Sequence, residues 1–419
     1  MRHRIIAGVA TLAALLAVSP AFATNGYFSL GYGTHARGMA GAGVALHLSS
    51  LAPATNPAAM AWIGHRYDLG LAHFSPDRHY SVSGSPSGYP GTFGLAPGEV
   101  HSHQGAFEVP NLGANWELDG VSTFGFALFG NGGMNTDYHA RTFGFAPTGV
   151  DMSQLFLAPT FARKLGDGRH SLGITAIFAA QRFKAQGLQA FASFSSDPSK
   201  LTNNGYSYSY GWGARIGYLG EIVDWLSIGA AYQTKVNMSR FDEYAGLFAD
   251  RGDFDIPSNW TIGVALQPNR SLDVALDVQR IHFSEVASVG NPLLPNLVQA
   301  PLGARGGAGF GWRDMTVYKV GLQWRPFDRW ALRAGYAWGD QPIPASEVLF
   351  NILAPGVMER HASLGFSHDF DRSGEVTFAV TRAFSSQVVG PNPLEAPGAQ
   401  TIELHMDQWE VEVGYSFGF

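Results

Sequence analysis

The strongest constraint on the fold is a strict alternation of apolar and polar residues at the C-terminus. From Trp409 to Phe419 every second residue is apolar or aromatic, and the residues between them are polar or glycine. Successive side chains of a β-strand point to opposite faces, so the pattern predicts a strand with one apolar face. Similar patterns recur at 260–267 and 272–279. A soluble β-sandwich gives the same alternation, so alternation alone leaves both folds open.

Three further features favour a membrane barrel. The apolar face of the last strand is bounded by aromatic residues and ends on Phe419, as a lipid-facing band would be. Acidic residues on the opposite face at 272–279 suit a wet lumen better than a dry core. Short turns such as 166–168 and 326–329 alternate with long stretches rich in Gly, Pro, Ser and Asn. This asymmetry is typical of outer-membrane barrels with long external loops.

We therefore expect an all-β protein, a transmembrane antiparallel β-barrel of about 14 strands over residues 62–419. Closure of the barrel is required because an open sheet would leave backbone groups exposed to lipid. The expected strand centres are Leu71, Leu112, Ala127, Leu157, Ile177, Ala214, Ala231, Val264, Ala275, Val320, Ala334, Leu364, Phe378 and Val413.

The N-terminus predicts export. A basic start at residues 1–4 is followed by an apolar run from Ile5 to Val18 and by the small residues Ala21 and Ala23. We expect a signal peptide over 1–23, cleaved near Ala23, and a location in the outer membrane of a Gram-negative bacterium. No later apolar stretch reaches the roughly 18 residues that a transmembrane helix needs, which excludes a helical membrane protein.

The composition excludes several functions. The chain has no cysteine, so a disulfide scaffold and a lipid-modified N-terminus are excluded. Its net charge of −6 makes nucleic acid an unexpected partner. Neither a Gly-x-Ser-x-Gly elbow nor a zinc-protease helix occurs, so we expect no enzyme and no cofactor. Gly31-x-Gly33-x-x-Ala36 fits a dinucleotide fingerprint as a bare pattern, but no strand precedes it and no acid follows at the required distance.

Residues 24–61 differ from the rest of the chain. They show no alternation, contain no acidic residue and are rich in Gly and Ala, for example at 38–45. Glycine tolerates close approach and unusual dihedral angles, so this segment can pack compactly in a tight space. Inside a barrel it would form a plug.

Together these features resemble the FadL/TodX family of outer-membrane transporters for long-chain fatty acids and other hydrophobic compounds. The resemblance covers essentially the whole mature chain and rests on the Gly/Ala-rich segment, the expected strand number, Asn56-Pro57-Ala58 and Phe419. It implies that residues 24–61 form a hatch inside the lumen and that Asn56, Pro57 and Ala58 are its motif. It also implies that the region near Thr24 shifts when ligand arrives.

The resemblance also implies a kinked third strand that opens the barrel wall toward the bilayer. The expected third strand reaches Gly130, Asn131, Gly132 and Gly133, and glycine clusters in strands mark bulges or breaks. An ordinary extracellular loop beginning at Gly130 is the alternative, and the sequence does not decide between them.

Two expected loops carry apolar residues that a solvated loop does not need. One holds Leu188, Phe191 and Phe194, and the other holds Tyr244, Leu247, Phe248 and Phe254. An outward groove between them would capture a hydrophobic ligand at about 0.8 kcal/mol per methylene removed from water. The alternative is that these side chains pack the loops together. We favour ligand capture, because the family resemblance implies that these two loops capture the ligand.

Cations are expected on the lumen face at Arg182, Lys319 and Arg333, where they could meet a carboxylate head group. The structural alternative is favoured, in which they pair with the lumen carboxylates Asp273, Asp277, Glu410 and Glu412.

Metal binding is not expected. His101 and His103 lie beside Glu99, but one short loop supplies too few ligands of fixed geometry, so a solvated loop is predicted.

The sequence therefore predicts a passive channel for long-chain fatty acids or other hydrophobic compounds, captured at the loops and released through the wall. Its expected partners are the hydrophobic ligand, outer-membrane lipid and, through the last strand ending in Phe419, the barrel-assembly machinery. The alternatives are a general porin for polar solutes and a barrel enzyme or adhesin. Apolar pockets discriminate weakly, so the sequence does not choose among fatty acids, alkanes and aromatic compounds.

Overall fold

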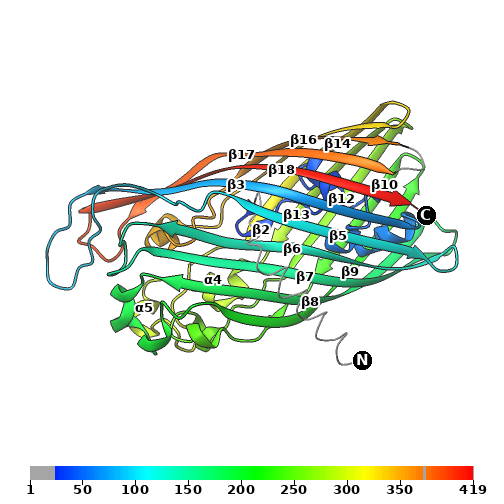
Figure 1. Cartoon of the computed structure of the whole chain (residues 1–419). Coiled ribbons are helices and arrows are strands. Elements are labelled where there is room, and N and C mark those ends of the chain that lie inside the picture. Colours follow the sequence, from blue (N-terminus) through cyan, green and yellow to red (C-terminus); the bar gives the residue numbers. More distant parts are fainter. Residues whose placement is uncertain (1–23, 371–373, 419) are drawn as a thin grey trace.

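The computed structural model describes residues 24–370 and 374–418, which form a closed barrel with an antiparallel wall (Figure 1). Fourteen strands make up the wall, as predicted. They are β3 (Arg66–Gly84), β5 (Phe107–Glu117), β6 (Ser122–Tyr138), β7 (Thr148–Leu165), β8 (His170–Gln186), β9 (Ser207–Val223), β10 (Leu226–Gln233), β12 (Asn259–Asn269), β13 (Leu272–Ile281), β14 (Met315–Phe327), β15 (Trp330–Gly339), β16 (Arg360–Asp369), β17 (Glu375–Pro391) and β18 (Gln400–Gly418).

The barrel closes between its first and last wall strands. β18 pairs with β3 along its whole length, from Gln400 opposite Gly84 to Gly418 opposite Arg66. Each expected strand centre falls in a different wall strand, so the alternation located the strands correctly. The predicted signal peptide and Phe419 lie outside the described residues, so their roles remain predictions.

The two rims of the barrel differ. One rim carries short connections such as 166–169 and 328–329, and β18 ends there. The opposite rim carries the long loops, which contain short strands and helices (Figure 1). These are β4 (Gly98–His101), η3 (Gln189–Phe194), η4 (Pro198–Lys200), β11 (Asn237–Met238), η5 (Asp242–Tyr244), α3 (Ala249–Gly252), η6 (Phe283–Glu285), α4 (Ala287–Gly290), α5 (Asn296–Gln299), η7 (Ala345–Glu347) and α6 (Val348–Asn351). Within 24–370 and 374–418, no helix is both long and apolar enough to cross a membrane.

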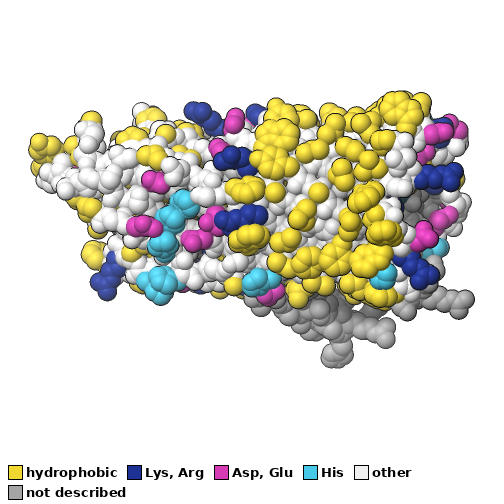
Figure 2. Space-filling model, turned by 90° about the horizontal axis from the view of Figure 1, so that it is seen from above, with side chains coloured by type: hydrophobic (Ala, Val, Ile, Leu, Met, Phe, Trp, Pro, Cys, Tyr) yellow, Lys and Arg dark blue, Asp and Glu magenta, His cyan; other side chains and the backbone are white. Residues whose placement is uncertain are grey.

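The outer surface of the wall carries an apolar belt. Leu71, Ile174 and Val413 are 52%, 55% and 53% exposed, although their side chains would be buried in a soluble core. Figure 2 shows apolar side chains gathered in a broad band on the face in view, with charged groups beyond both of its edges. A large exposed apolar band with polar rims is the surface that lipid covers.

The N-terminal segment lies inside the barrel, as predicted. It contains β1 (Thr24–Asn25), β2 (Phe28–Ser29), α2 (Thr34–Gly38), η1 (Ala52–Ala54) and η2 (Pro57–Trp62). α2 contacts β15 to β18, and η2 contacts β7 to β9, so the segment spans the lumen from side to side. We call residues 24–62 the hatch.

Glycines on the inner wall make room for the hatch. A Cβ atom at Gly229 would lie 2.3 Å from the Val44 carbonyl oxygen, and one at Gly217 would lie 2.0 Å from Asn56 Oδ1. Carbon and oxygen atoms do not approach so closely, so larger residues would push the hatch away. The wall glycines in such contact are Gly113, Gly125, Gly132, Gly173, Gly217, Gly229, Gly263, Gly321, Gly335, Gly365 and Gly414.

Candidate functional site

The wall contains a break in strand pairing between β5 and β6. The two strands pair only from Asn111 opposite Phe129 to Glu117 opposite Thr123. Beyond this point the two strands no longer pair with each other: residues 107–110 of β5 keep their pairing with β3, and the rest of β6 keeps its pairing with β7. Pro110 lies at the start of the break and has no N–H to donate, which suits a strand edge.

The glycine cluster lies on the β6 side of the break. The register between β6 and β7 shifts between Gly130 and Gly132, so Asn131 is the extra residue of a β-bulge. The Asn131 side chain is buried in the lumen, where it donates to Gln154 Oε1 at 2.9 Å and accepts from the Tyr32 hydroxyl at 3.0 Å. The alternative of a loop beginning at Gly130 is wrong, because β6 continues to Tyr138.

The hatch reaches the break at Gly132. Phe28 of β2 forms a bridge with Gly132, and a Cβ atom there would lie 1.8 Å from the Tyr27 carbonyl oxygen. Only glycine permits this approach. Gly132 and Gly133 therefore join the wall to the hatch, since the Gly133 N–H also donates to the Tyr27 carbonyl oxygen at 3.2 Å, whereas Gly130 lies beside the contact.

An apolar groove covers the outer side of the break. It has a volume of about 630 Å³ and opens on the lipid-facing surface. The strands β18, β3, β5, β6 and β7 contribute to its lining, which includes Leu69, Leu71, Val109, Pro110, Leu112, Leu128, Gly130, Leu155, Val413 and Tyr415. A hydrocarbon in this groove would be in contact with the lipid chains.

The inner side of the break is filled by the first residues of the hatch. A cavity of about 30 Å³ lies between Thr24, Tyr27, Arg78 and Met134. A cavity that holds benzene measures about 150 Å³, so this space takes only a water or two. The structure is therefore closed to a hydrophobic ligand at this point.

Tyr27 connects the hatch to the external loops. Its ring centroid lies 5.3 Å from that of Phe283, 5.7 Å from that of Trp312 and 6.2 Å from that of Phe254. The ring centroid of Phe254 in turn lies 4.8 Å from that of Phe248. These side chains belong to one buried apolar cluster that extends from the loops to the break in the wall.

The predicted capture residues lie in this cluster. Leu188, Phe191, Leu247, Phe248 and Phe254 are almost fully buried, as is Tyr244, and Phe194 is 36% exposed. The expected outward groove is therefore wrong for this conformation. The facing loops bury their apolar side chains against each other and against Phe183, because burial of each is worth about 1.5 to 3 kcal/mol.

The three predicted lumen cations all face inward and each has its own partners. Lys319 Nζ donates to the Leu30 carbonyl oxygen at 3.0 Å. Arg333 Nε donates to Gln323 Oε1 at 2.7 Å. Arg182 Nε donates to Ser153 Oγ at 3.1 Å. The structure does not bring the three cations to a shared site, so a carboxylate-binding role for them remains a prediction.

The lumen carboxylates bind the hatch. Glu410 and Glu412 both pair with Arg37 of α2, and the Arg37 Nε to Glu412 Oε2 distance is 2.6 Å. Asp277 accepts hydrogen bonds from the backbone N–H groups of Gly43 and Val44, at 2.7 and 3.0 Å. The expected pairing with wall cations is therefore incorrect for Glu410 and Glu412, because the hatch brings its own cation into the lumen. Asp277 lies opposite Lys319 in the sheet, but its hydrogen bonds are with the hatch.

Asp273, the fourth predicted carboxylate, does pair within the wall. Its Oδ2 lies 2.8 Å from Arg325 Nη2 and accepts from Gln323 Nε2 at 2.8 Å.

The Asn56-Pro57-Ala58 motif anchors the hatch to β9. Asn56 Nδ2 donates to the carbonyl oxygens of Val44 and Tyr218, at 2.8 and 2.9 Å, and Oδ1 accepts from the Ala58 N–H at 3.1 Å. Pro57 begins η2, where a missing N–H costs nothing. Asn56 thus caps η2, binds the hatch backbone at Val44 and binds the wall at Tyr218.

Arg78 is a buried residue at the break that sequence reasoning missed. Its guanidinium group donates to the carbonyl oxygens of Gln104 and Asn135, which lie on the two sides of the break. On β3 it interrupts an inward face that otherwise carries Phe74, Tyr80 and Val82. The sequence does carry a signal for Arg78: it is a charged residue at an inward position of β3, where the alternation otherwise has apolar residues.

Comparison with known proteins places the chain in a family. The family described as "Outer membrane protein transport protein (OMPP1/FadL/TodX)" matches residues 10–408. A search of curated proteins found no match.

Solved structures share the fold. The toluene transporter TodX of P. putida is 20% identical, with a TM-score of 0.68 over 93% of this chain and 99% of TodX. A Pseudomonas aeruginosa FadL homologue is 18% identical, with a TM-score of 0.68 over 94% and 100% of the two chains. The Ralstonia pickettii toluene transporter TbuX is 18% identical, with a TM-score of 0.63 over 93% and 99%. With the family match, these findings show that the chain belongs to the FadL/TodX family of outer-membrane transporters of hydrophobic compounds.

Proposed function

We propose that this chain is a passive channel, gated by its hatch, for long-chain fatty acids or hydrocarbons. The ligand is captured at the external loops, enters the buried apolar cluster, displaces the start of the hatch and leaves sideways between β5 and β6. The observation that carries this proposal is the meeting of three features at Gly132: the apolar cluster reaches it through Tyr27 and Phe28, the hatch is in contact there, and β6 no longer pairs with β5 there.

Capture requires the loops to separate. Phe194 is the one predicted capture residue that is substantially exposed in the closed structure, so it is the proposed first contact. Behind it lies Phe191, whose ring is 5.6 Å from that of Phe350 on the neighbouring loop. A ligand that replaces one of these contacts gains about 0.8 kcal/mol per buried methylene, which offsets the cost of opening the loops.

The gate is the segment from Thr24 to Phe28. Gln408 holds it through two hydrogen bonds: its Oε1 accepts from the Thr24 backbone nitrogen at 3.1 Å, and its Nε2 donates to Thr24 Oγ1 at 3.0 Å. Movement of this segment would enlarge the small cavity beside Arg78 until it joins the outer groove. The same movement would remove the Phe28 contact with Gly132.

Exit follows from partition into lipid. The outer groove is apolar and opens on the membrane belt, so a hydrocarbon that passes the break does not meet water again. The concentration gradient and transfer into the bilayer supply the free energy, and no bound cofactor is needed.

The ligand class is inferred from the family and from the break itself. The related TodX and TbuX are toluene transporters, which supports a monoaromatic hydrocarbon. Arg78, at the inner side of the break, would in addition suit the carboxylate of a fatty acid. Both classes fit the apolar cluster.

The test is uptake of labelled oleate and labelled toluene by cells that lack their own hydrophobic channel, with and without this chain. We expect the chain to raise uptake of at least one ligand. If uptake of both is the same with and without the chain at the outer membrane, the proposal is wrong. Loss of oleate uptake alone in Arg78→Leu would assign the fatty acid.

A further inference from the structure

Three histidines form a row on the outside of the barrel, beyond the apolar belt. His405 of β18 lies opposite His79 of β3, and His79 lies opposite His101 of β4. The ring centroids are 4.2 Å apart for the first pair and 4.7 Å apart for the second. Figure 2 shows histidine and acidic side chains gathered beside the belt. The sequence predicts a solvated loop around His101 with too few metal ligands. In the structure, histidines from two neighbouring strands lie beside that loop.

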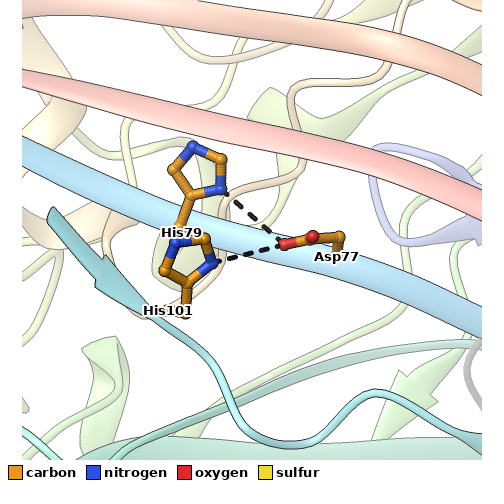
Figure 3. A group of neighbouring side chains, drawn as sticks. All are labelled: Asp77, His79 and His101. Carbon is orange, nitrogen blue, oxygen red and sulfur yellow. Dashed lines mark ion pairs between the residues drawn. The ribbon is translucent and has the colours of Figure 1, made fainter.

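Two carboxylates complete this cluster on opposite sides of the imidazole rings. Asp77 Oδ1 lies 3.7 Å from His79 Nδ1 and 3.7 Å from His101 Nδ1 (Figure 3). Glu99 Oε1 lies 2.7 Å from His101 Nε2 and 3.7 Å from His79 Nε2. Each ring thus turns one nitrogen toward Asp77 and the other toward Glu99.

The Asp77 side has the spacing of a metal site. The three atoms Asp77 Oδ1, His79 Nδ1 and His101 Nδ1 all lie within 4.8 Å of one another. Ligands at about 2.0 to 2.1 Å from a tetrahedral ion are separated by roughly 3.4 Å, so small side-chain rotations would bring these atoms to ligand distance. Glu99 would then accept from the far nitrogens, and such a carboxylate orients metal-bound imidazole.

We propose that Asp77, His79 and His101 bind one divalent transition-metal ion, with Zn²⁺ as the reference ion. Two imidazole nitrogens select Zn²⁺, Cu²⁺ or Ni²⁺ over Mg²⁺ and Ca²⁺, which prefer oxygen ligands. The fourth position is open to solvent, because Asp77 and His101 are exposed. The proposal rests on this geometry and not on the transport mechanism.

The site lies in the polar layer outside the membrane. Trp409, an aromatic residue of the belt, lies opposite Ser75. His79 is four residues beyond Ser75 on β3, which is roughly 13 Å along the strand. β4 is held to β3 by four residue pairs, and a metal ion would join the two strands through their side chains.

The test uses the full untagged chain, refolded in detergent and stripped with EDTA, titrated with Zn²⁺ by calorimetry. We expect one ion per chain, and X-ray absorption of the bound Zn²⁺ should show two imidazole ligands. His79→Asn and His101→Asn should each weaken binding at least about 10- to 100-fold, the loss typical of disturbing even the outer shell of a metal site. Absence of binding by the unaltered chain would overturn the proposal.

A matched control is available on the same surface. His73 and Glu108 form a pair at 2.6 Å whose side chains are 53% and 51% exposed, nearly the same as the 55% and 54% of His101 and Glu99. This pair has one imidazole, so His73→Asn should leave Zn²⁺ binding unchanged. Equal loss in His73→Asn, or full binding by the His79→Asn, His101→Asn double variant, would refute the assignment. Heat-modified migration on gels checks that every variant is folded.

Discussion

The two parts of the hatch are held in different ways. The body, residues 30–62, is fixed by charge and by buried hydrogen bonds: Arg37 pairs with Glu410 and Glu412, and Asp277 accepts from two backbone N–H groups. The tip, residues 24–28, is held by two hydrogen bonds with Gln408 and by aromatic packing. In the described part of the chain, no ion pair involves the tip.

This difference indicates which part moves. A hydrogen bond contributes about 0.5 to 3 kcal/mol, the upper part of this range applying when the donor is charged, whereas leaving a buried charge without its partner costs about 3 to 5 kcal/mol. Displacement of the tip separates no ion pair among the described residues and is therefore the less costly motion. The tip is also the part that touches both the loop aromatic cluster and Gly132. We infer that the body is a fixed plug and the tip is the gate.

The largest expected effect is on conductance and comes from removing both the tip and the body of the hatch. Deletion of residues 24–61 should change a barrel of low conductance in planar bilayers into an open channel, because the lumen left behind is lined by polar and charged residues. The unaltered chain is the control. A general porin for polar solutes would already conduct strongly before the deletion, and an unchanged conductance would show that the hatch does not block the lumen.

The next largest effect is a loss of stability when the ion pairs between the hatch body and the wall are removed. Arg37→Ala leaves Glu410 and Glu412 buried without their cation, so we expect a loss of about 3 to 5 kcal/mol in stability. The midpoint of heat-modified migration on gels measures this loss. Arg169→Ala, which removes an exposed pair with Asp224, should cost at most about 1 kcal/mol. Equal midpoints for the two variants would contradict the fixed body.

A smaller effect loosens the tip alone. Gln408→Leu removes both hydrogen bonds to Thr24 and should raise the open population of the tip roughly ten-fold, as about 1.4 kcal/mol would. Hydrogen exchange followed by mass spectrometry should be faster in 24–28. Exchange at Ala58, in the body, serves as the internal control. If the two regions speed up together, tip and body move as one unit and the comparison fails.

The smallest effect concerns the loop that covers the tip. Burial, and then the neighbouring charge of Asp255, raises the pKa of Asp253 to about 6. Because the folded loop binds the proton more tightly than the unfolded chain does, its stability should fall as the pH rises from about 4 to 6. After correction for the intrinsic pH dependence of exchange, amides in 234–258 should therefore be more strongly protected at pH 5 than at pH 7. Asp253→Asn should remove this pH dependence, and a loop that is most protected at pH 7 would contradict the assignment.

Much of the fold could be predicted from the sequence because alternation is a local signal. Each expected strand centre falls in its own wall strand, and the acid-free segment lies inside the lumen. The glycine cluster at 130–133 indicated an irregular strand, but its form depends on pairing with β7 and on contact with Phe28. Such long-range pairing leaves no local pattern.

The site was less predictable for the same reason. The sequence favours pairing of the lumen carboxylates with wall cations, whereas Glu410, Glu412 and Asp277 bind the hatch, whose position the sequence does not give. The sequence also predicts an outward groove lined by the loop aromatic residues, but the loops cover these side chains. Asp77 and His79 were missed as neighbours of His101 because strand register alone brings them together.

The central claim is that ligand leaves through the break beside the bulge in β6, and one deletion tests it most directly. Removing Asn131 deletes the extra residue, so β6 pairs continuously with β7 and the bulge that lies beside the break between β5 and β6 is lost. We predict that uptake of labelled toluene and oleate falls to the level of cells without the chain, while the barrel still migrates as a folded species. Deletion of Gly88, in the external loop 85–97, is the matched control and should leave uptake unchanged. Full uptake by the folded Asn131 deletion would show that ligand takes another route.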